Sequence, residues 1–169
     1  VDALTDARTE ELYKMWYNPV VTDTYEPGST FKLMNVATAY ELGVVHAEDT
    51  FYCGGSMMVG DGKEPIKCHN TNGHGSQTLT QAVMNSCNVA MMQIVAKTGR
   101  ERFYDFFKAF GMNSRTGIDL PNESPGIFFD VEDSTSWNEV SLAVSSFGQR
   151  FQVTPIQMAS MISAIVDNG

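Results

Sequence analysis

The sequence predicts an α+β chain in which several helices flank one segment of short strands. Apolar residues recur at helical spacing before and after residues 50–76, and glycines follow several of these runs. Residues 50–76 are rich in glycine and other turn formers and show no amphipathic helical pattern, so they predict short strands and loops. With 169 residues, 43% of them hydrophobic and 18% charged, the chain is long enough to bury a core.

The N-terminal part of the chain contains two predicted helices separated by a proline break. An acidic segment beginning at Thr5 has helical character and breaks at Asn18-Pro19, because the residue before a proline disfavours helical geometry. A second helix is expected to begin at or near Ser29 and to stop at Gly43. Its apolar face comprises Phe31, Met34, Ala37, Ala39 and Tyr40.

The remainder of the chain contains further predicted helices joined by loops. One begins near Thr80, and the runs NVAMMQIVAKTG (88–99) and RERFYDFFKAFG (100–111) predict two more. TGIDLPNESPGIFF (116–129) predicts a loop, and a long apolar helix is expected to begin near Pro155, a favourable first-turn residue. The helix over 100–111 carries phenylalanines at the spacing of one face: Phe103, Phe106, Phe107 and Phe110.

The charge balance and the hydropathy pattern limit the classes of partner. Eleven Lys and Arg against twenty Asp and Glu give a formal net charge of −9, which argues against nucleic acid as a partner. The apolar run VAMMQIVA is short and contains Gln93, so no membrane-spanning helix is predicted. No signal peptide is visible at the N-terminus, and we expect any export or anchoring segment to lie outside this chain.

Ser29 and Lys32 form an S-x-x-K arrangement, the only one in the chain. Residues at i and i+3 share a helix face, so the serine hydroxyl and the lysine amine can come within hydrogen-bonding reach. The lysine can accept the serine proton only if its pKa falls well below about 10.4. A helix N-terminus at Ser29 would favour a developing oxyanion. Taken alone, the pattern favours a simpler interpretation, a helix-capping serine beside an exposed lysine.

The surrounding phrases change that interpretation. TYEPGSTFK (24–32) resembles the active-site segment of penicillin-binding protein transpeptidases, and Ser86-Cys87-Asn88 resembles their second motif, S-x-N. The phrases GHGSQTL, FKAFGMNSRTGIDLPNES and SSFGQRFQVTPIQMA also fall in the family order. The resemblance runs from about Asp23 to the C-terminus and is closest to class B proteins of the sporulation and division type of Gram-positive bacteria. A second S-x-N, Ser136-Trp137-Asn138, lacks the flanking family phrase and is interpreted as chance.

The resemblance implies the serine β-lactamase/penicillin-binding protein transpeptidase fold, a helical subdomain beside an antiparallel sheet. Residues 1–169 would form a partial transpeptidase domain with most of the helices and little of the sheet. The implied activity is a peptidoglycan DD-transpeptidase that cross-links cell-wall stem peptides through a serine acyl-enzyme. β-Lactam antibiotics would acylate the same serine.

The family roles transfer residue by residue. Ser29 matches the nucleophile that attacks the D-Ala–D-Ala bond, and Lys32 matches the general base. Ser86 matches the hydroxyl that relays the proton to the leaving amine, and Asn88 matches the amide that holds the substrate backbone. The resemblance further implies the extracytoplasmic face of the cell membrane, an N-terminal anchor outside this chain, and divisome or spore-wall proteins as partners.

Two other classes of function share some of these features. A β-lactam-hydrolysing or β-lactam-sensing serine domain also has S-x-x-K and S-x-N, but TGIDLPNES and FGQRFQVTPIQMA resemble transpeptidase phrases. A non-catalytic cell-wall scaffold would require the loss of Ser29 or Lys32, and both are present. The chain departs from the family at Arg150, where glycine often follows Gly148-Gln149, and this departure affects the expected loop shape near the cleft.

Lys97-Thr98-Gly99 has the letters of the third family motif, which binds the substrate carboxylate from a strand. The triplet comes soon after Asn88 and precedes a phenylalanine-rich helical pattern, so we interpret it as a helix end. Because family members continue towards the true triplet, we expect this chain to be a fragment that lacks it. One oxyanion-hole donor would then be absent, which costs about 10²–10³ in turnover in comparable enzymes, so the fragment itself should be impaired. Its uncovered sheet-facing helices should favour self-association.

A zinc site is the remaining prediction, and it concerns the glycine-rich segment before the S-x-N motif. Some class B members bind zinc in this loop, and the resemblance places Cys53, Cys68 and His74 on the ligand positions. The candidates for a fourth ligand, in order, are Cys87, His69 and Asp49. A Cys53–Cys68 disulfide and thiols without a role are the alternatives. No cofactor is required for the implied reaction, and the zinc ion would be structural.

Overall fold

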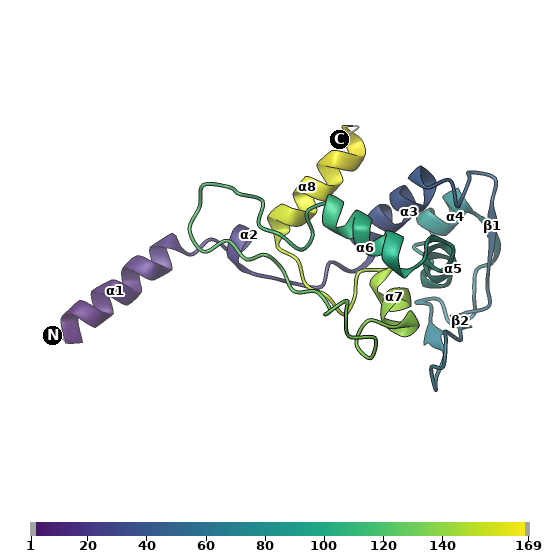
Figure 1. Ribbon diagram of the computed structural model, residues 1–169, viewed down its shortest axis with the longest axis horizontal. Coiled ribbons are helices and arrows are strands. Elements are labelled where there is room, and N and C mark those ends of the chain that lie inside the picture. The colour runs from purple at the N-terminus through teal and green to yellow at the C-terminus, as the bar shows by residue number, and fades with distance from the viewer. Residues whose placement is uncertain (1–2, 168–169) are drawn as a thin grey trace.

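The computed structural model describes residues 3–167, and in them helices predominate over short antiparallel strands (Figure 1). This arrangement agrees with the predicted α+β class; the ends of the expected domain, residues 1–2 and 168–169, lie outside the described residues. The helices are α1 (Ala3–Trp16), α2 (Pro19–Thr22), the 3-10 helix η1 (Gly28–Phe31), α3 (Lys32–Glu41), α4 (Leu79–Met84), α5 (Asn88–Thr98), α6 (Arg100–Ala109), α7 (Glu139–Ser145) and α8 (Pro155–Val166). The strands are β1 (Thr50–Cys53), β2 (Ser56–Met57), β3 (Ile66–Lys67) and β4 (Gly75–Thr78).

The glycine-rich segment forms two small antiparallel sheets, as its composition predicts. β1 pairs with β4, with Cys53 opposite Gly75, and β2 pairs with β3, with Ser56 opposite Lys67. The side chains of Phe51 and Cys53 alternate inward along β1 and are buried against the helices. The segment therefore folds back on itself and brings its beginning and its end together beside α5.

Helix starts follow the local capping chemistry of the sequence. The Thr78 side chain accepts from the backbone N–H of Gln81 while the Gln81 side chain accepts from the N–H of Thr78, so α4 begins with a capping box. Thr154 forms the same arrangement with Gln157 at the start of α8, and Pro155 occupies the first helical position. The helix starts expected near Thr80 and Pro155 are confirmed.

Two helices were not predicted from the sequence. α2 is a single turn after Asn18, whose side chain accepts from the backbone N–H of Val20. α7 begins after Asn138, whose side chain accepts from the backbone N–H of Ser141. The second S-x-N triplet therefore contributes a helix cap, which agrees with its interpretation as chance.

The core consists of two groups of buried apolar side chains, one on each side of α3 and α5. In the first, α5 packs against the strands, with Met91, Met92 and Ile94 almost fully buried. In the second, the rings of Phe31 and Phe151 lie 4.7 Å apart and the rings of Phe107 and Phe151 lie 5.2 Å apart. These aromatic contacts hold α6 against η1 and α3.

The predicted apolar faces are confirmed in their centres and wrong at their edges. Phe103 and Phe107 are fully buried, but Phe106 and Phe110 are only half-buried. On α3, Phe31, Met34 and Ala39 are buried, Ala37 is half-buried and Tyr40 is 57% exposed. Tyr40 is exposed because it does not share the helix face of Met34 and Ala39: at about 100° per residue it lies on the opposite side of α3.

The chain after α7 packs directly against the turn that leads into η1. The backbone N–H of Gly28 donates to the carbonyl oxygen of Gly148 at 2.8 Å, and Tyr25 and Val153 form an antiparallel bridge. Gly148 has a φ of +81°, and a Cβ added to it would lie 2.1 Å from the carbonyl oxygen of Gly28. Glycine is therefore required here by both backbone conformation and space.

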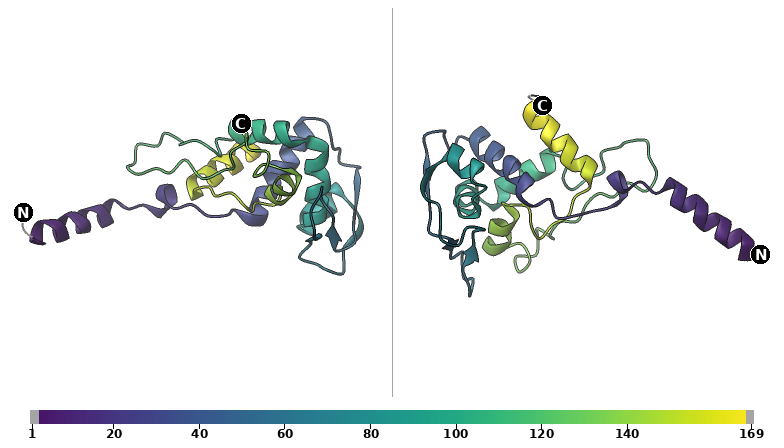
Figure 2. Two further views of the ribbon diagram at one scale, coloured as in Figure 1. Left: turned by 60° about the horizontal axis from the view of Figure 1, so that its bottom comes forward. Right: turned by 180° about the vertical axis from the view of Figure 1, so that it is seen from behind.

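α1 projects from one end of the molecule, and the further views in Figure 2 show the same extension. It ends in large apolar side chains that are exposed: Leu12, Tyr13, Met15 and Trp16. Within residues 3–167, no helix has both the length and the apolar character needed to span a membrane. Self-association of the chain through exposed apolar surface stays a prediction.

Gly148→Ala is expected to lower the free energy of unfolding by about 3 kcal/mol, because it combines a strained φ with a backbone collision. Gly117→Ala is a matched control: Gly117 has the same φ of +81°, but a Cβ there meets nothing within 4 Å. The control should therefore lose only about 1 kcal/mol. Urea unfolding followed by tryptophan fluorescence measures both, and equal losses would contradict the close approach of the two glycines.

Candidate active site and metal-ligating cluster

Lys32 lies at the centre of the candidate active site, where the start of α3 faces the start of α5. Its Nζ donates to the carbonyl oxygen of Ser86 at 2.6 Å, to Ser86 Oγ at 2.8 Å and to Asn88 Oδ1 at 2.7 Å. The residue is only 4% exposed, and these acceptors match the three N–H donors of an ammonium group. The structure thus brings together the lysine of S-x-x-K and both polar residues of S-x-N.

The packing of α3 on α5 makes this contact possible. Asn35, one turn after Lys32, is fully buried, and its Nδ2 donates to the carbonyl oxygen of Met91 at 3.1 Å. Sequence analysis missed Asn35, although a polar residue within the apolar face of a predicted helix was an available signal. A buried amide with a hydrogen-bond partner fixes how far one helix can slide along the other.

Ser29 is exposed at the surface beside the buried lysine. It lies in η1, and the backbone N–H of Lys32 donates to its carbonyl oxygen. Among the contacts of residues 3–167, Ser29 Oγ takes part in no hydrogen bond, so the direct contact with Lys32 anticipated from the i, i+3 spacing is absent. The reason is that Ser86 and Asn88 accept all three protons of the lysine. While all three of these bonds are in place, Lys32 has no lone pair to accept the proton of Ser29, so it must lose a proton before it can act as a base.

The environment of Lys32 favours loss of one proton. Burial lowers the pKa of its ammonium group, because desolvation disfavours the charged form. The nearby sulfurs of Cys68 and Cys87 oppose this effect but are the smaller influence. The pKa of Lys32 therefore shifts in the direction that a general base requires.

Ser86 reaches Lys32 through an unusual backbone conformation. Its φ is +48°, in the left-handed region that a residue with a Cβ rarely adopts. This conformation lies in the turn between α4 and α5 and directs both the carbonyl oxygen and the hydroxyl of Ser86 to the same ammonium group. Asn88 opens α5, and its Nδ2 donates to the carbonyl oxygen of Lys67 at 3.4 Å.

The Lys97-Thr98-Gly99 triplet is a helix end, as predicted. Lys97 lies in the last turn of α5, and Gly99 separates α5 from α6. The Nζ of Lys97 forms an ion pair with Asp49 at 3.4 Å, and Thr98 Oγ1 donates to the carbonyl oxygen of Ile94 within the helix. The side chains of Lys97 and Thr98 therefore make structural contacts at the end of α5.

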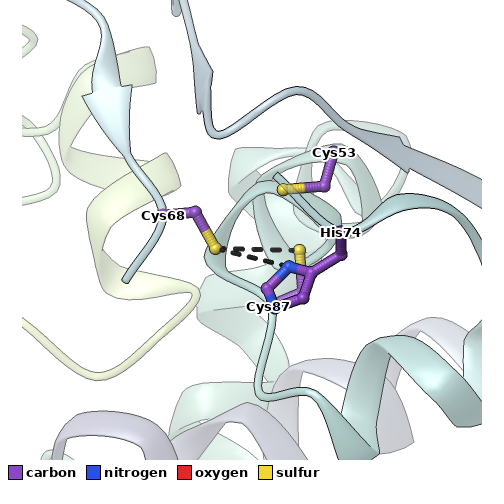
Figure 3. Close-up of side chains that lie close together, drawn as sticks. All are labelled: Cys53, Cys68, His74 and Cys87. Atoms are coloured by element: carbon purple, nitrogen blue, oxygen red, sulfur yellow. Dashed lines mark hydrogen bonds between the residues drawn. The ribbon is translucent and has the colours of Figure 1, made fainter. Parts of the chain in front are cut away.

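Four candidate metal ligands converge beside the S-x-N turn (Figure 3). The ligand atoms of Cys53, Cys68, His74 and Cys87 all lie within 4.8 Å of one another. Cys68 Sγ lies 3.9 Å from Cys87 Sγ and 3.8 Å from His74 Nδ1. Tetrahedral zinc with Zn–S bonds of about 2.3 Å separates neighbouring sulfurs by about 3.8 Å, so the spacing fits one zinc ion.

The other two candidates for a fourth ligand lie outside this group. His69 Nδ1 is 3.8 Å from Cys68 Sγ, but the residue is exposed and is not one of the four convergent ligands. Asp49 accepts from the backbone N–H of His46 and pairs with Lys97 instead. The order proposed from the sequence, with Cys87 first, agrees with the arrangement.

The three cysteines are free thiols in the structure, so the alternative of a Cys53–Cys68 disulfide is not observed. Burial would raise the pKa of the Cys68 thiol, but the backbone N–H groups of Asn70, Asn88 and Val89 hold that pKa below its ordinary value. Burial raises the pKa of Cys87 to about 11. Donors already directed at a sulfur favour the thiolate that zinc requires, so the residues present fit a zinc ion.

Gln77 is a neighbour of this cluster that sequence analysis missed. It is 3% exposed, and its Oε1 accepts from Asn85 Nδ2 at 3.1 Å. In the described part of the chain its buried Nε2 has no hydrogen-bond partner, and it lies beside the Cys87 sulfur, where it favours the thiolate. A polar side chain at an inward position of a short strand was the available signal.

Comparison with known proteins identifies the relatives of this arrangement. The family model for the penicillin binding protein transpeptidase domain matches residues 3–169. Stage V sporulation protein D of Bacillus subtilis is 40% identical over 90% of this chain and 23% of its own length. A peptidoglycan D,D-transpeptidase FtsI homolog of Mesostigma viride is 31% identical over 94% of this chain and 27% of its own length.

A solved structure has the same fold. Penicillin-binding protein 3 of Mycobacterium tuberculosis, complexed with aztreonam, superposes with a TM-score of 0.80 at 30% identity, over 90% of this chain and 33% of that chain. The chain spans about a quarter of the length of the curated relatives named above. The match supports the α+β fold that the resemblance implies. Because the family model covers the chain from residue 3 to residue 169, the chain belongs to the penicillin-binding protein transpeptidase family.

Proposed function

We propose that this protein is a serine DD-transpeptidase that cross-links the stem peptides of peptidoglycan. The observation that carries the proposal is the contact of Lys32 Nζ with Ser86 Oγ and Asn88 Oδ1, three residues after the exposed Ser29. A nucleophile next to a buried lysine, which is in turn bonded to a second hydroxyl, can move a proton in both halves of an acyl transfer. The name of the FtsI homolog and the aztreonam complex of the solved relative are consistent with it.

In the first half of the proposed reaction, Ser29 Oγ attacks the carbonyl carbon of the D-Ala–D-Ala bond. Lys32, once it has lost a proton, accepts the proton of Ser29, and the charge that develops on the carbonyl oxygen lies near the helix N-terminus at η1. Ser86, bonded to Lys32, passes a proton to the departing amine of D-Ala. The C–N bond breaks, and the acyl group remains on Ser29.

In the second half, an amine of a neighbouring strand attacks the ester carbonyl. Its proton passes through Ser86 to Lys32, Lys32 gives a proton to Ser29 Oγ, and the ester C–O bond breaks so that Ser29 leaves as the hydroxyl. Asn88 would hold the substrate backbone through its amide, which lies beside the lysine. β-Lactams would acylate Ser29 in the same way, because their strained amide presents the same carbonyl to the nucleophile.

Cys53, Cys68, His74 and Cys87 would hold one structural zinc ion. The ion would cross-link the glycine-rich segment to the turn that carries Ser86 and Asn88, and it would supply no chemistry to the acyl transfer. This proposal rests on the spacing of the ligands and on the donors directed at their sulfurs.

We further propose that the protein acts at the extracytoplasmic face of the cell membrane, where peptidoglycan is made. Its partners would be spore-wall or divisome proteins. The name of the relative that is 40% identical, a sporulation protein, favours the first of these.

Ser29→Ala should abolish covalent labelling of the full-length protein by a fluorescent penicillin, because no other group is proposed to form the acyl-enzyme. Ser163→Ala, which removes an exposed hydroxyl on α8, is the control and should label normally. The adduct should persist through denaturing electrophoresis. Rapid turnover of the penicillin by the unaltered protein would contradict a transpeptidase and favour a hydrolase.

The acylation rate should rise with pH and reach a plateau, because only the neutral amine of Lys32 can accept the proton of Ser29. Burial lowers the pKa of Lys32, so the rise should be complete below the ordinary lysine value of about 10.4. Lys32→Arg should lower the rate at least about 10²-fold, since arginine stays protonated. Stopped-flow measurements give both the pH dependence of acylation and the rate of Lys32→Arg. Lys108→Arg, at an exposed position, is the control. A pH-independent rate would exclude Lys32 as the base.

Protein purified without chelator should contain about one zinc per chain, measured by atomic emission. His74→Ala and Cys87→Ser should lose the metal, whereas the neighbouring His69→Ala should keep it. Cobalt substitution should produce sulfur-to-cobalt charge-transfer absorption that is absent from Cys87→Ser. A Cys–Cys disulfide found by mass spectrometry of the unreduced protein would overturn the zinc proposal.

A further inference from the structure

Arg150 has a backbone conformation that its side chain makes unfavourable. Among the described residues, only Ser86, Asn122 and Arg150 combine a side chain with a positive φ, and Arg150 has the largest value, +66°. Asparagine tolerates this region, and Ser86 belongs to the candidate active site. Strain of this kind persists only where the surroundings impose it, and it is found most often at functional sites.

The surroundings that impose it belong to the segment before Ser29. The backbone N–H of Arg150 donates to Glu26 Oε1 at 2.8 Å, a contact across 124 residues. The Gly28 N–H donates to the Gly148 carbonyl oxygen, also at 2.8 Å. Residues 148–150 are thus bonded at two points to residues 26–28, which directly precede the proposed nucleophile.

The guanidinium group of Arg150 is free to bind a ligand. The residue is exposed, and the ion pairs found within residues 3–167 join Lys97 to Asp49 and Lys108 to Asp105. Glu26, the acidic residue in contact with Arg150, directs a carboxylate oxygen at its backbone N–H. In a chain with a net charge of −9, Arg150 is an unpaired positive charge next to the segment that precedes the proposed nucleophile.

The chemistry of the group indicates the class of ligand. A guanidinium donates two parallel hydrogen bonds, which matches a carboxylate better than any neutral group. Because hydrogen bonds tie residues 148–150 to Glu26 and Gly28, the side chain of Arg150 starts next to the segment that leads into Ser29. We propose that Arg150 is a specificity residue that binds a carboxylate on the acyl-donor strand, away from the bond that is cleaved. This inference rests on the proposed transpeptidase function of Ser29.

Benzylpenicillin and carbenicillin provide the test, because they differ by one carboxylate on the acyl side chain. In the full-length protein, Arg150→Gly should slow acylation by carbenicillin roughly fivefold and leave the rate with benzylpenicillin within about twofold. In the unaltered protein, added salt should reduce the difference between the acylation rates with the two penicillins. Arg150→Lys should retain part of the preference for carbenicillin, because it keeps the positive charge. It should not retain all of it, because lysine lacks the paired donors of the guanidinium group.

Asn122→Gly is the matched control for placing glycine at a positive φ. Asn122 has a φ of +62°, close to that of Arg150, so the substitution introduces glycine in a similar backbone conformation without removing a charge. It should leave both acylation rates unchanged, and Arg150→Gly should not lower the melting temperature. Equal effects of Arg150→Gly on the two penicillins, or no effect on either, would overturn the proposed role of Arg150. These outcomes would leave the proposed function of Ser29 unaffected. Failure of the unaltered protein to react with either penicillin would overturn the proposed function and this inference with it.

Discussion

The candidate active site depends on the burial of one lysine between two helices. Lys32 is almost fully buried, and a buried ammonium group is tolerated only when each of its donors has an acceptor. Ser86 and Asn88 provide those acceptors from the start of α5. The contact therefore requires α3 and α5 to pack in one register, which the buried Asn35 also specifies. The rest of the site, from Ser29 to the cysteine cluster, is arranged around this pair of helix starts.

The cysteine cluster and the S-x-N motif share a single turn. Cys87 lies between Ser86 and Asn88, and its sulfur accepts from the backbone N–H of Ala90 at the start of α5. A ligand held by Cys87 would therefore restrain the same backbone that presents two hydrogen-bond acceptors to Lys32. The strained φ of Ser86 adds a reason for such a restraint, because a turn of this kind relaxes unless its neighbours hold it.

Several elements could be predicted because their signals are local. Thr78 with Gln81 and Thr154 with Gln157 are capping boxes that can be recognised in the sequence, and both helices begin there. The end of α5 at Gly99 was predicted for the same reason, and it explains why the Lys-Thr-Gly triplet has no catalytic geometry. α7 was missed because its capping residue, Asn138, follows a polar loop without an apolar period. Its burial comes from contacts with distant segments.

The sequence by itself determined the family, the candidate residues and most helix boundaries, since motifs and caps are short and contiguous. Only the tertiary structure decided that Lys32 bonds to Ser86 and Asn88 and not to Ser29. It also decided that Cys53 and Cys87 meet at one point, and that Arg150 lies against the segment before the nucleophile. These contacts join residues far apart in the chain, and packing, which no local pattern encodes, determines which of them form.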